Sequence, residues 1–291
     1  MQRAFTRFIG VDLGGARGKT TAIAEIRAVR AGQNAAQVIE VATRAHRRTP
    51  MEAGGQAWTD DTLIERLAAA AGPDTVIAID APLTQAACGR CTLAVCPGME
   101  ACADPAVIWL RTEGRALVRK VAAETVGGGG PRPAFTAQLR VAPYAHRATD
   151  IVMTYERGLL PLSAIGHTNG AIASRAGQLR RRLRGAGFEL HRNLLEVSPS
   201  ATVTALCGPR TARGYKRDAD PWQTRAMILE GFDDLSFAPQ SRMAREEVLQ
   251  SDHSFDAVIS AYTAYLWARD GWPTPDGCFG EDGWIAAPPS R

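Results

Sequence analysis

Four acidic residues lie where a short apolar segment ends or where a helix is expected to begin: Asp12, Asp80, Glu196 and Asp256. Carboxylates at the ends of neighbouring strands meet at one edge of a sheet, because adjacent strands lie only about 4.8 Å apart. Such groups repel one another unless cations lie among them. Hard oxygen ligands of this kind suit magnesium or manganese. Two such ions about 3.5–4 Å apart can activate a water and stabilise the leaving oxygen of a phosphodiester.

Each of these acidic residues also has a purely structural interpretation. An Asp at the end of a strand often forms a turn. Asp252 or Ser254 could cap the last helix, and Asp256 could complement the positive end of that helix. Glu196 is harder to explain in this way, because a lone charge inside the apolar segment "LLEVSP" is costly without a partner. The residues alone leave both interpretations open.

Hydrophobic patterning predicts the elements that would position these residues. Three strand-like segments come first, followed by a helix with an N-terminal Asp and then by a nearly continuous apolar strand. These elements are residues 8–13, 20–26, 36–43, 60–73 and 75–82. Their order predicts an α/β fold with a mixed sheet, in which three antiparallel strands are followed by parallel strands and a crossover helix makes the connection. Further helices are predicted over 105–124, 151–160, 171–187, 221–232 and 254–271, with strands at "NLLEV" and "GWIAAP".

The glycine-rich stretch after Asp12 ends in Gly18, Lys19 and Thr20, which is similar to the end of a phosphate-binding loop. A Walker A loop needs Gly, four residues and then Gly-Lys-Ser/Thr, and it must open a helix. Here Leu13 stands where the first glycine is required, and "TTAIAEI" alternates like a strand. We therefore expect a hairpin with Asp12 at its mouth.

Four cysteines form a compact group with the spacing C-x2-C-x4-C-x5-C: Cys88, Cys91, Cys96 and Cys102. In a cytoplasmic protein this pattern favours a metal over disulfides. Zinc accepts four thiolates, and a run that contains Cys-Pro also fits an iron–sulfur cluster. Unliganded or redox-active thiols are the remaining alternative. We expect any such metal to stabilise a Cys-rich insertion over residues 84–150 within a single domain of residues 1–291.

Three further segments are rich in basic or unusual polar residues. "QLRRRLRGAG" carries four arginines on a helix whose apolar stripe should face inward, and such a charge run is usually a solvated face. The segment 209–223, "PRTARGYKRDADPWQ", is expected to be a loop near the acidic edge. Either segment could instead track a nucleic-acid backbone. The stretch 142–150, "APYAHRATD", could reach over the acidic site.

Bulk composition is that of an ordinary globular protein. The chain has 291 residues, 45% hydrophobic and 22% charged, with a net charge of +4 that points weakly to an anionic partner. No stretch of about 18 apolar residues is present, so we expect no membrane span and a cytoplasmic protein. Composition gives no indication of oligomeric state.

Four segments together resemble the ribonuclease H-like superfamily: "FIGVDLGG", "VIAIDAPL", "LLEVSPSATV" and "DHSFDAVISAYTAYLWARDG". Within it they most resemble the uncharacterised family of predicted RNase H-fold nucleases. The last helix is also similar to that of Holliday-junction resolvases, which carry a His-x-x-Asp pair there. In this chain that pair is His253 and Asp256, three residues apart and so on one helix face.

The resemblance implies a metal-dependent nuclease that hydrolyses DNA or RNA. It assigns Asp12, Asp80 and Asp256 as ligands of magnesium or manganese, and His253 as a group that positions water or assists proton transfer. Glu196 matches a motif of the predicted nucleases and is expected beside the metals, with Asp252 as a reserve ligand. Many resolvase-like enzymes carry Glu at the position of Asp80, so the side chain of Asp80 is one methylene shorter than theirs.

Two other functions are compatible with the same sequence features. Sugar kinases and actin-like ATPases share the fold and an Asp-x-Gly first strand, although they duplicate the fold and need a second phosphate hairpin. A catalytically inactive module that binds nucleic acid or a protein is the other alternative. Cleavage that depends on magnesium and on Asp12 would distinguish a nuclease from both.

Overall fold

The computed structural model describes residues 5–15, 20–29, 35–45, 56–127, 141–159, 170–239, 241 and 243–289. Within these ranges a seven-stranded sheet has the order β6-β3-β2-β1-β4-β5-β7. The bounds are β1 Arg7–Asp12, β2 Ala22–Ala28, β3 Ala36–Ala42, β4 Thr75–Asp80, β5 Leu194–Val197, β6 Leu235–Phe237 and β7 Ile285–Ala286.

The first three strands pair in antiparallel fashion, and β4 pairs parallel to β1 after the crossover helix α1, Asp60–Ala68. Strands β5 and β7 extend the parallel part, and β6 adds a parallel edge strand next to β3. The predicted α/β class and mixed sheet are therefore confirmed. The segment after the glycines forms strand β2 and not a helix, although Gly18 and Lys19 themselves lie outside the described residues.

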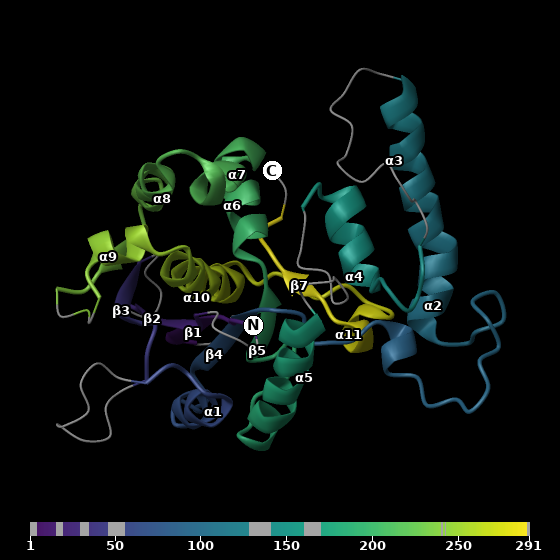
Figure 1. The fold of residues 1–291 in the computed structure, drawn as a ribbon, viewed down its shortest axis with the longest axis horizontal. Helices are drawn as coiled ribbons and strands as arrows, with labels where there is room; N and C mark the ends of the chain where they lie inside the picture. The colour runs from purple at the N-terminus through teal and green to yellow at the C-terminus, as the bar shows by residue number, and fades with distance from the viewer. Residues whose placement is uncertain are drawn as a thin grey trace.

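Helices cover both faces of the sheet (Figure 1). The long helix α10, Asp252–Asp270, lies directly on one face together with α6 Pro199–Cys207, α7 Pro209–Arg217, α8 Pro221–Glu230 and α9 Arg245–Gln250. Helices α1 and α5, Gly170–Gly185, cover the other face. The apolar stripe of α5 is buried as predicted, so most of its arginines face solvent.

Gly10 sets the distance between β1 and α10. A side chain at this position would collide with the backbone of Ala257 and Ala261, so the helix approaches the strand as closely as only glycine permits. This close approach brings the first turns of α10 against the carboxyl ends of β1 and β4. The sheet thus supplies two sides of a site, and the helix supplies the third.

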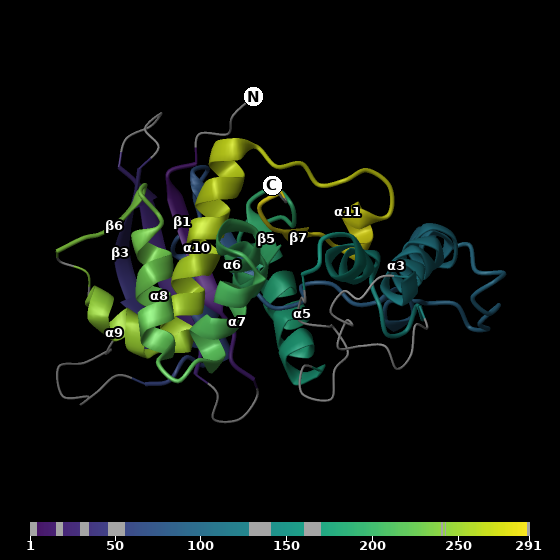
Figure 2. The same ribbon diagram turned by 90° about the horizontal axis from the view of Figure 1, so that it is seen from above.

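Together with α11, Phe279–Asp282, the described part of the segment 84–150 lies to one side of the sheet, as Figure 2 shows from above. Its helices are η1 Ala87–Gly89, α2 Pro105–Trp109, η2 Leu110–Gly114, α3 Arg115–Gly127 and α4 Ala148–Ile151, which continues into η3 Val152–Glu156. They pack through Ala106, Val107 and Val152 on α11, Phe279–Asp282, and on the aromatic ring of Trp284. Among the described helices, none combines the length and apolar character needed to cross a membrane.

Residues 209–217 are not the predicted loop but form α7, whereas α8 begins at Pro221, where a helix is predicted. Each of these two helices begins with a proline. Proline suits this position because its fixed φ is helical and its missing N–H would have no partner there. Tyr215 is fully buried under α10, and this packing offsets the poor helix propensity of the segment.

Candidate metal centre

Three carboxylates converge at the carboxyl ends of β1 and β4. Asp12 and Asp80 are directly opposite one another in the parallel register, so their side chains point to the same face of the sheet. That face carries α10, and Asp256 on its second turn completes the group. Ligand oxygens of the three residues lie within 4.8 Å of one another. We call these three residues the acidic triad.

The acidic triad is buried. Asp12, Asp80 and Asp256 are only 9%, 7% and 2% exposed. Burial, followed by the charges of the two other carboxylates, raises the pKa of Asp80 well above its usual range. Burial also raises the pKa of Asp256 to about 6, although the Lys216 ammonium opposes this shift. Asp80 and Asp256 therefore resist ionising together unless further positive charge is brought to them.

Asp80 is the least satisfied member of the triad. Across the described part of the chain, no hydrogen bond or ion pair reaches its carboxylate, whereas Asp12 and Asp256 both have partners. A buried carboxylate without donors is costly and usually marks either a protonated acid or a cation site. The oxygen donor set fits a hard divalent cation such as magnesium or manganese.

His253 faces the triad from the start of α10. Its Nδ1 atom lies 2.6 Å from Asp12 Oδ2, and this hydrogen bond raises the pKa of the imidazole. The ring is about one-third exposed, so it connects the buried carboxylates with solvent. Asp252 lies outside the triad, and its Oδ1 accepts a hydrogen bond from the His253 backbone N–H. The cap of α10 is Ser251, not Asp252 or Ser254.

Lys216 and Tyr215 lie in the segment expected near the acidic edge, but their contacts with Asp256 were not predicted from the sequence. Lys216 Nζ lies 2.6 Å from Asp256 Oδ2, and the Tyr215 hydroxyl donates to Asp256 Oδ1 at 3.0 Å. Burial lowers the pKa of Lys216, but the nearby carboxylates, Asp256 first, raise it on balance. One signal was available: Lys216 is one of only three lysines in a chain with 34 basic residues.

Glu196 lies near the triad but faces the other way. It is opposite Ile79 in the register, and Ile79 belongs to the core on the α1 and α5 face. Both Glu196 oxygens accept hydrogen bonds from the Arg147 guanidinium, at 2.7 and 2.8 Å. The Leu83 backbone N–H donates a third, at 2.8 Å. Its predicted catalytic role stays a prediction, and the contacts define a buried ion pair.

The partner of Glu196 comes from the stretch 142–150. Arg147 is fully buried, and it also binds Asp150 through two hydrogen bonds of 2.8 and 3.2 Å. Tyr144 is exposed, and His146 Nδ1 accepts a hydrogen bond from the Ala142 N–H. This stretch therefore holds the 84–150 segment to β5 through Arg147.

The four cysteines lie in a surface loop, residues 88–102, which we call the cysteine loop. Cys88, Cys91 and Cys96 are exposed, Cys102 is half-buried, and all four are free thiols. Zinc holds thiolates at about 2.3 Å, which places their sulfurs about 3.8 Å apart. Within the described residues, only the acidic triad has three ligand atoms within 4.8 Å of one another. The cysteine loop is thus not closed around a single-ion site in this conformation.

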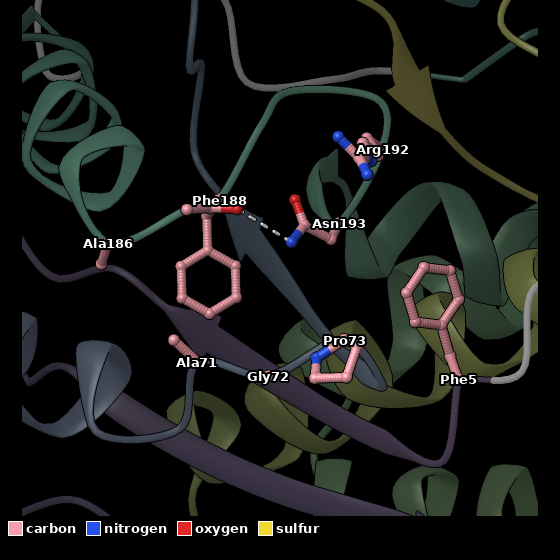
Figure 3. Close-up of a pocket in the computed structure, with 9 residues that line it drawn as sticks. Phe5, Ala71, Gly72, Pro73, Ala186, Phe188, Arg192 and Asn193 are labelled. Carbon is pink, nitrogen blue, oxygen red and sulfur yellow. Dashed lines mark hydrogen bonds between the residues drawn. The ribbon is translucent and has the colours of Figure 1, made fainter.

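Cavities lie at both ends of the central strands. A pocket of about 690 Å³ lies at the amino ends of β1 and β4. Phe5, Pro73 and Phe188 line it (Figure 3). Its position is one strand length, about 17 Å, from the triad. A second cavity, of about 910 Å³, lies at the carboxyl end of β1, and Thr21, Arg175 and Ser254 help to line it. The second cavity is at the same end of the sheet as the acidic triad, although none of the triad residues lines it.

Comparisons with known proteins place the chain at the level of a family. Comparison with curated proteins and with solved structures gives no significant match. Residues 10–277 match the family described as "Protein of unknown function (DUF429)". This match includes the end of β1 and all of β4, β5 and α10, and therefore all three residues of the acidic triad. The chain belongs to the DUF429 family.

Proposed function

We propose that this chain is a metal-dependent hydrolase of phosphodiester bonds in nucleic acid, with an RNase H-like fold. The observation that carries the proposal is the buried, unpartnered Asp80 carboxylate between two other acids at one end of the sheet. The sheet order, with three antiparallel strands and then parallel ones, is compatible with that fold.

Asp12, Asp80 and Asp256 would hold magnesium or manganese. A divalent ion bound there would lower the pKa of a water and neutralise charge on a phosphate oxygen. Asp12 holds the His253 ring by its Nδ1 atom, which leaves Nε2 free to exchange a proton with water or with the leaving oxygen. Burial of the triad excludes bulk water and strengthens each of these interactions.

The second cavity, at the same end of the sheet as the triad, supports an anionic, hydroxyl-bearing substrate. Hydroxyls from Thr21, Ser251 and Ser254 line it, and the Ser254 Oγ is buried without a hydrogen-bond partner. Arg175 lines the same cavity and is held by Asp60 at 2.6 Å. Exposed arginines on α5 and α7 supply positive charge on the surrounding surface.

Cleavage assays with labelled DNA, RNA and RNA–DNA hybrid test the proposal. Cleavage should require Mg²⁺ or Mn²⁺ and stop with a chelator, and Asp12→Asn should lower the rate at least 100-fold. Asp61→Asn is the matched control, because this exposed carboxylate of α1 lies outside the triad. Equal activity in wild type and Asp12→Asn would contradict the proposal, as would ATP hydrolysis without any nucleic-acid cleavage. Manganese binding without either activity would favour the inactive binding module.

At the cysteine loop we propose a structural metal, zinc or an iron–sulfur cluster, that binds after the loop rearranges. The support is the sequence spacing of the four thiols and the exposure of three of them. Burial and then the charges of the three other thiols raise the pKa of Cys88. Elemental analysis and visible absorbance of freshly purified protein test this proposal. A fully folded protein with neither zinc nor iron would contradict it.

A further inference from the structure

Lys216 brings a fixed positive charge to the acidic triad. Its ammonium lies 2.6 Å from Asp256 Oδ2, while the Tyr215 hydroxyl binds Asp256 Oδ1 at 3.0 Å. Both oxygens of Asp256 are therefore already engaged by donors from α7. On the sheet side, Asp80 has no such donor among the described residues. Asp256 thus has an ammonium partner and Asp12 an imidazole partner, whereas Asp80 has neither within the described part of the chain.

The packing of α7 holds this ammonium in place. Tyr215 is fully buried, and its ring centre lies 5.2 Å from that of Phe255 on α10. The Arg225 Nε donates to the Tyr215 carbonyl oxygen at 2.8 Å, which fixes the end of α7 from α8. The Lys216 side chain is 40% exposed, and its Nζ lies 5.3 Å from the centre of the Tyr215 ring. Lys216 therefore lies at the solvent-facing side of the triad, with its ammonium bound to Asp256.

A pair of divalent ions would conflict with this arrangement. Two ions separated by about 3.5–4 Å need carboxylate oxygens on both sides of the triad. The second ion would have to share Asp256 with the ammonium. Two positive charges bound to the same carboxylate lie close together, and they repel strongly in a buried site. One divalent ion and one ammonium, in contrast, carry the three positive charges that balance three carboxylates.

We propose that the triad takes a single divalent ion and that Lys216 occupies the place of the second. This inference rests on the proposed metal site, and it adds that the lysine is a built-in part of the charge balance. The triad residues would hold the ion, and Lys216 would position Asp256 while supplying fixed charge to the same pocket. A second metal would not be required for hydrolysis.

Manganese titration of the full-length chain tests the inference without relying on catalysis. Calorimetry and electron paramagnetic resonance should give one Mn²⁺ per wild-type chain. Lys216→Met should bind two ions, with the spectrum of a coupled pair, and should bind the first about tenfold more tightly. Lys216→Arg, which keeps the charge, should bind one. Arg217→Met is the matched control, because this neighbouring cation is exposed and should leave binding unchanged.

Each contrary result has a distinct meaning. Two ions in the wild-type chain, or one ion with unchanged affinity in Lys216→Met, would overturn the role of Lys216. The wild-type count remains decisive even if Lys216→Met fails to fold, which circular dichroism would reveal. No bound manganese in wild type would instead overturn the proposed metal site itself.

Discussion

Replacing Arg147 with Met should destabilise the protein more than almost any other single change of charge. The guanidinium is fully buried and donates five hydrogen bonds, which end on Glu196, Asp150 and Thr84. Methionine matches much of the arginine stem in length but donates nothing. The variant would leave two carboxylates buried, each at most 8% exposed at its side chain, without their cation.

The expected cost follows from those two orphaned charges. Removing one partner of a buried ion pair typically costs about 3–5 kcal/mol, because the remaining charge is left without compensation. For a chain of this size, 1 kcal/mol changes the melting temperature by about 2–4 °C, so we expect a drop of about 6–20 °C. Arg147→Lys should recover only part of this loss, since one ammonium cannot bind two carboxylates in bidentate fashion.

Thermal and urea unfolding in the presence of a chelator measure this cost without interference from metal. Arg182→Met is the matched control, because its ion pair with Asp61 is on the surface, at 3.4 Å, and should contribute less than about 1 kcal/mol. Adding Glu196→Gln to Arg147→Met should restore some stability by removing one orphaned charge. A loss below about 1 kcal/mol in Arg147→Met would refute the account of this ion pair.

Three further predictions concern the sheet and the triad. Asp80→Asn should stabilise the metal-free protein at neutral pH by about 1–3 kcal/mol. Because the pKa of Asp80 is raised in the folded state, the stability of the wild-type protein falls as pH rises and this acid ionises, whereas Asn cannot ionise. Chemical unfolding at several pH values checks this. Gly10→Ala should cost at least about 1–3 kcal/mol in thermal unfolding because its methyl meets the Ala257 backbone, whereas Gly177→Ala on α5, where space is open, should be neutral or stabilising. Burial alone would raise the pKa of Glu25, but hydrogen bonds from three arginines lower it to about 2, so this carboxylate should contribute stability above about pH 4.5 that is lost as pH falls towards 2. In an acid titration, Glu25→Gln should lose less stability than wild type between about pH 4.5 and 2. An equal loss of stability in the two proteins would contradict this role of Glu25.

The sheet could be predicted from the sequence because its central strands have a clear local pattern of apolar residues. β1 and β4 are continuous apolar runs that end in Asp, and both occur where the pattern predicts them. Their parallel pairing follows from the helix between them. Asp256 could be placed on a helix, but the contact between that helix and β1 depends on Gly10, whose role becomes visible only in three dimensions.

The remaining site residues depend on register and packing, which a single sequence does not encode locally. The residue that pairs with Ile79 decides whether Glu196 shares a face with Asp80. A shift of one residue in this register would turn the Glu196 side chain to the face of Asp80. Lys216 reaches Asp256 from 40 positions earlier in the chain through a helix with weak local signals. Arg147 was visible as an unusual residue, yet nothing local identifies its partner 49 positions away.

The contact between His253 and Asp12 joins positions that are 241 residues apart. During synthesis at about 5–20 residues per second, the amino-terminal half of the candidate centre would therefore wait on the order of tens of seconds for its counterpart. A ribosome-bound fragment would carry two acids and no complete cation pocket. Only a nearly finished chain can therefore bring all three carboxylates together.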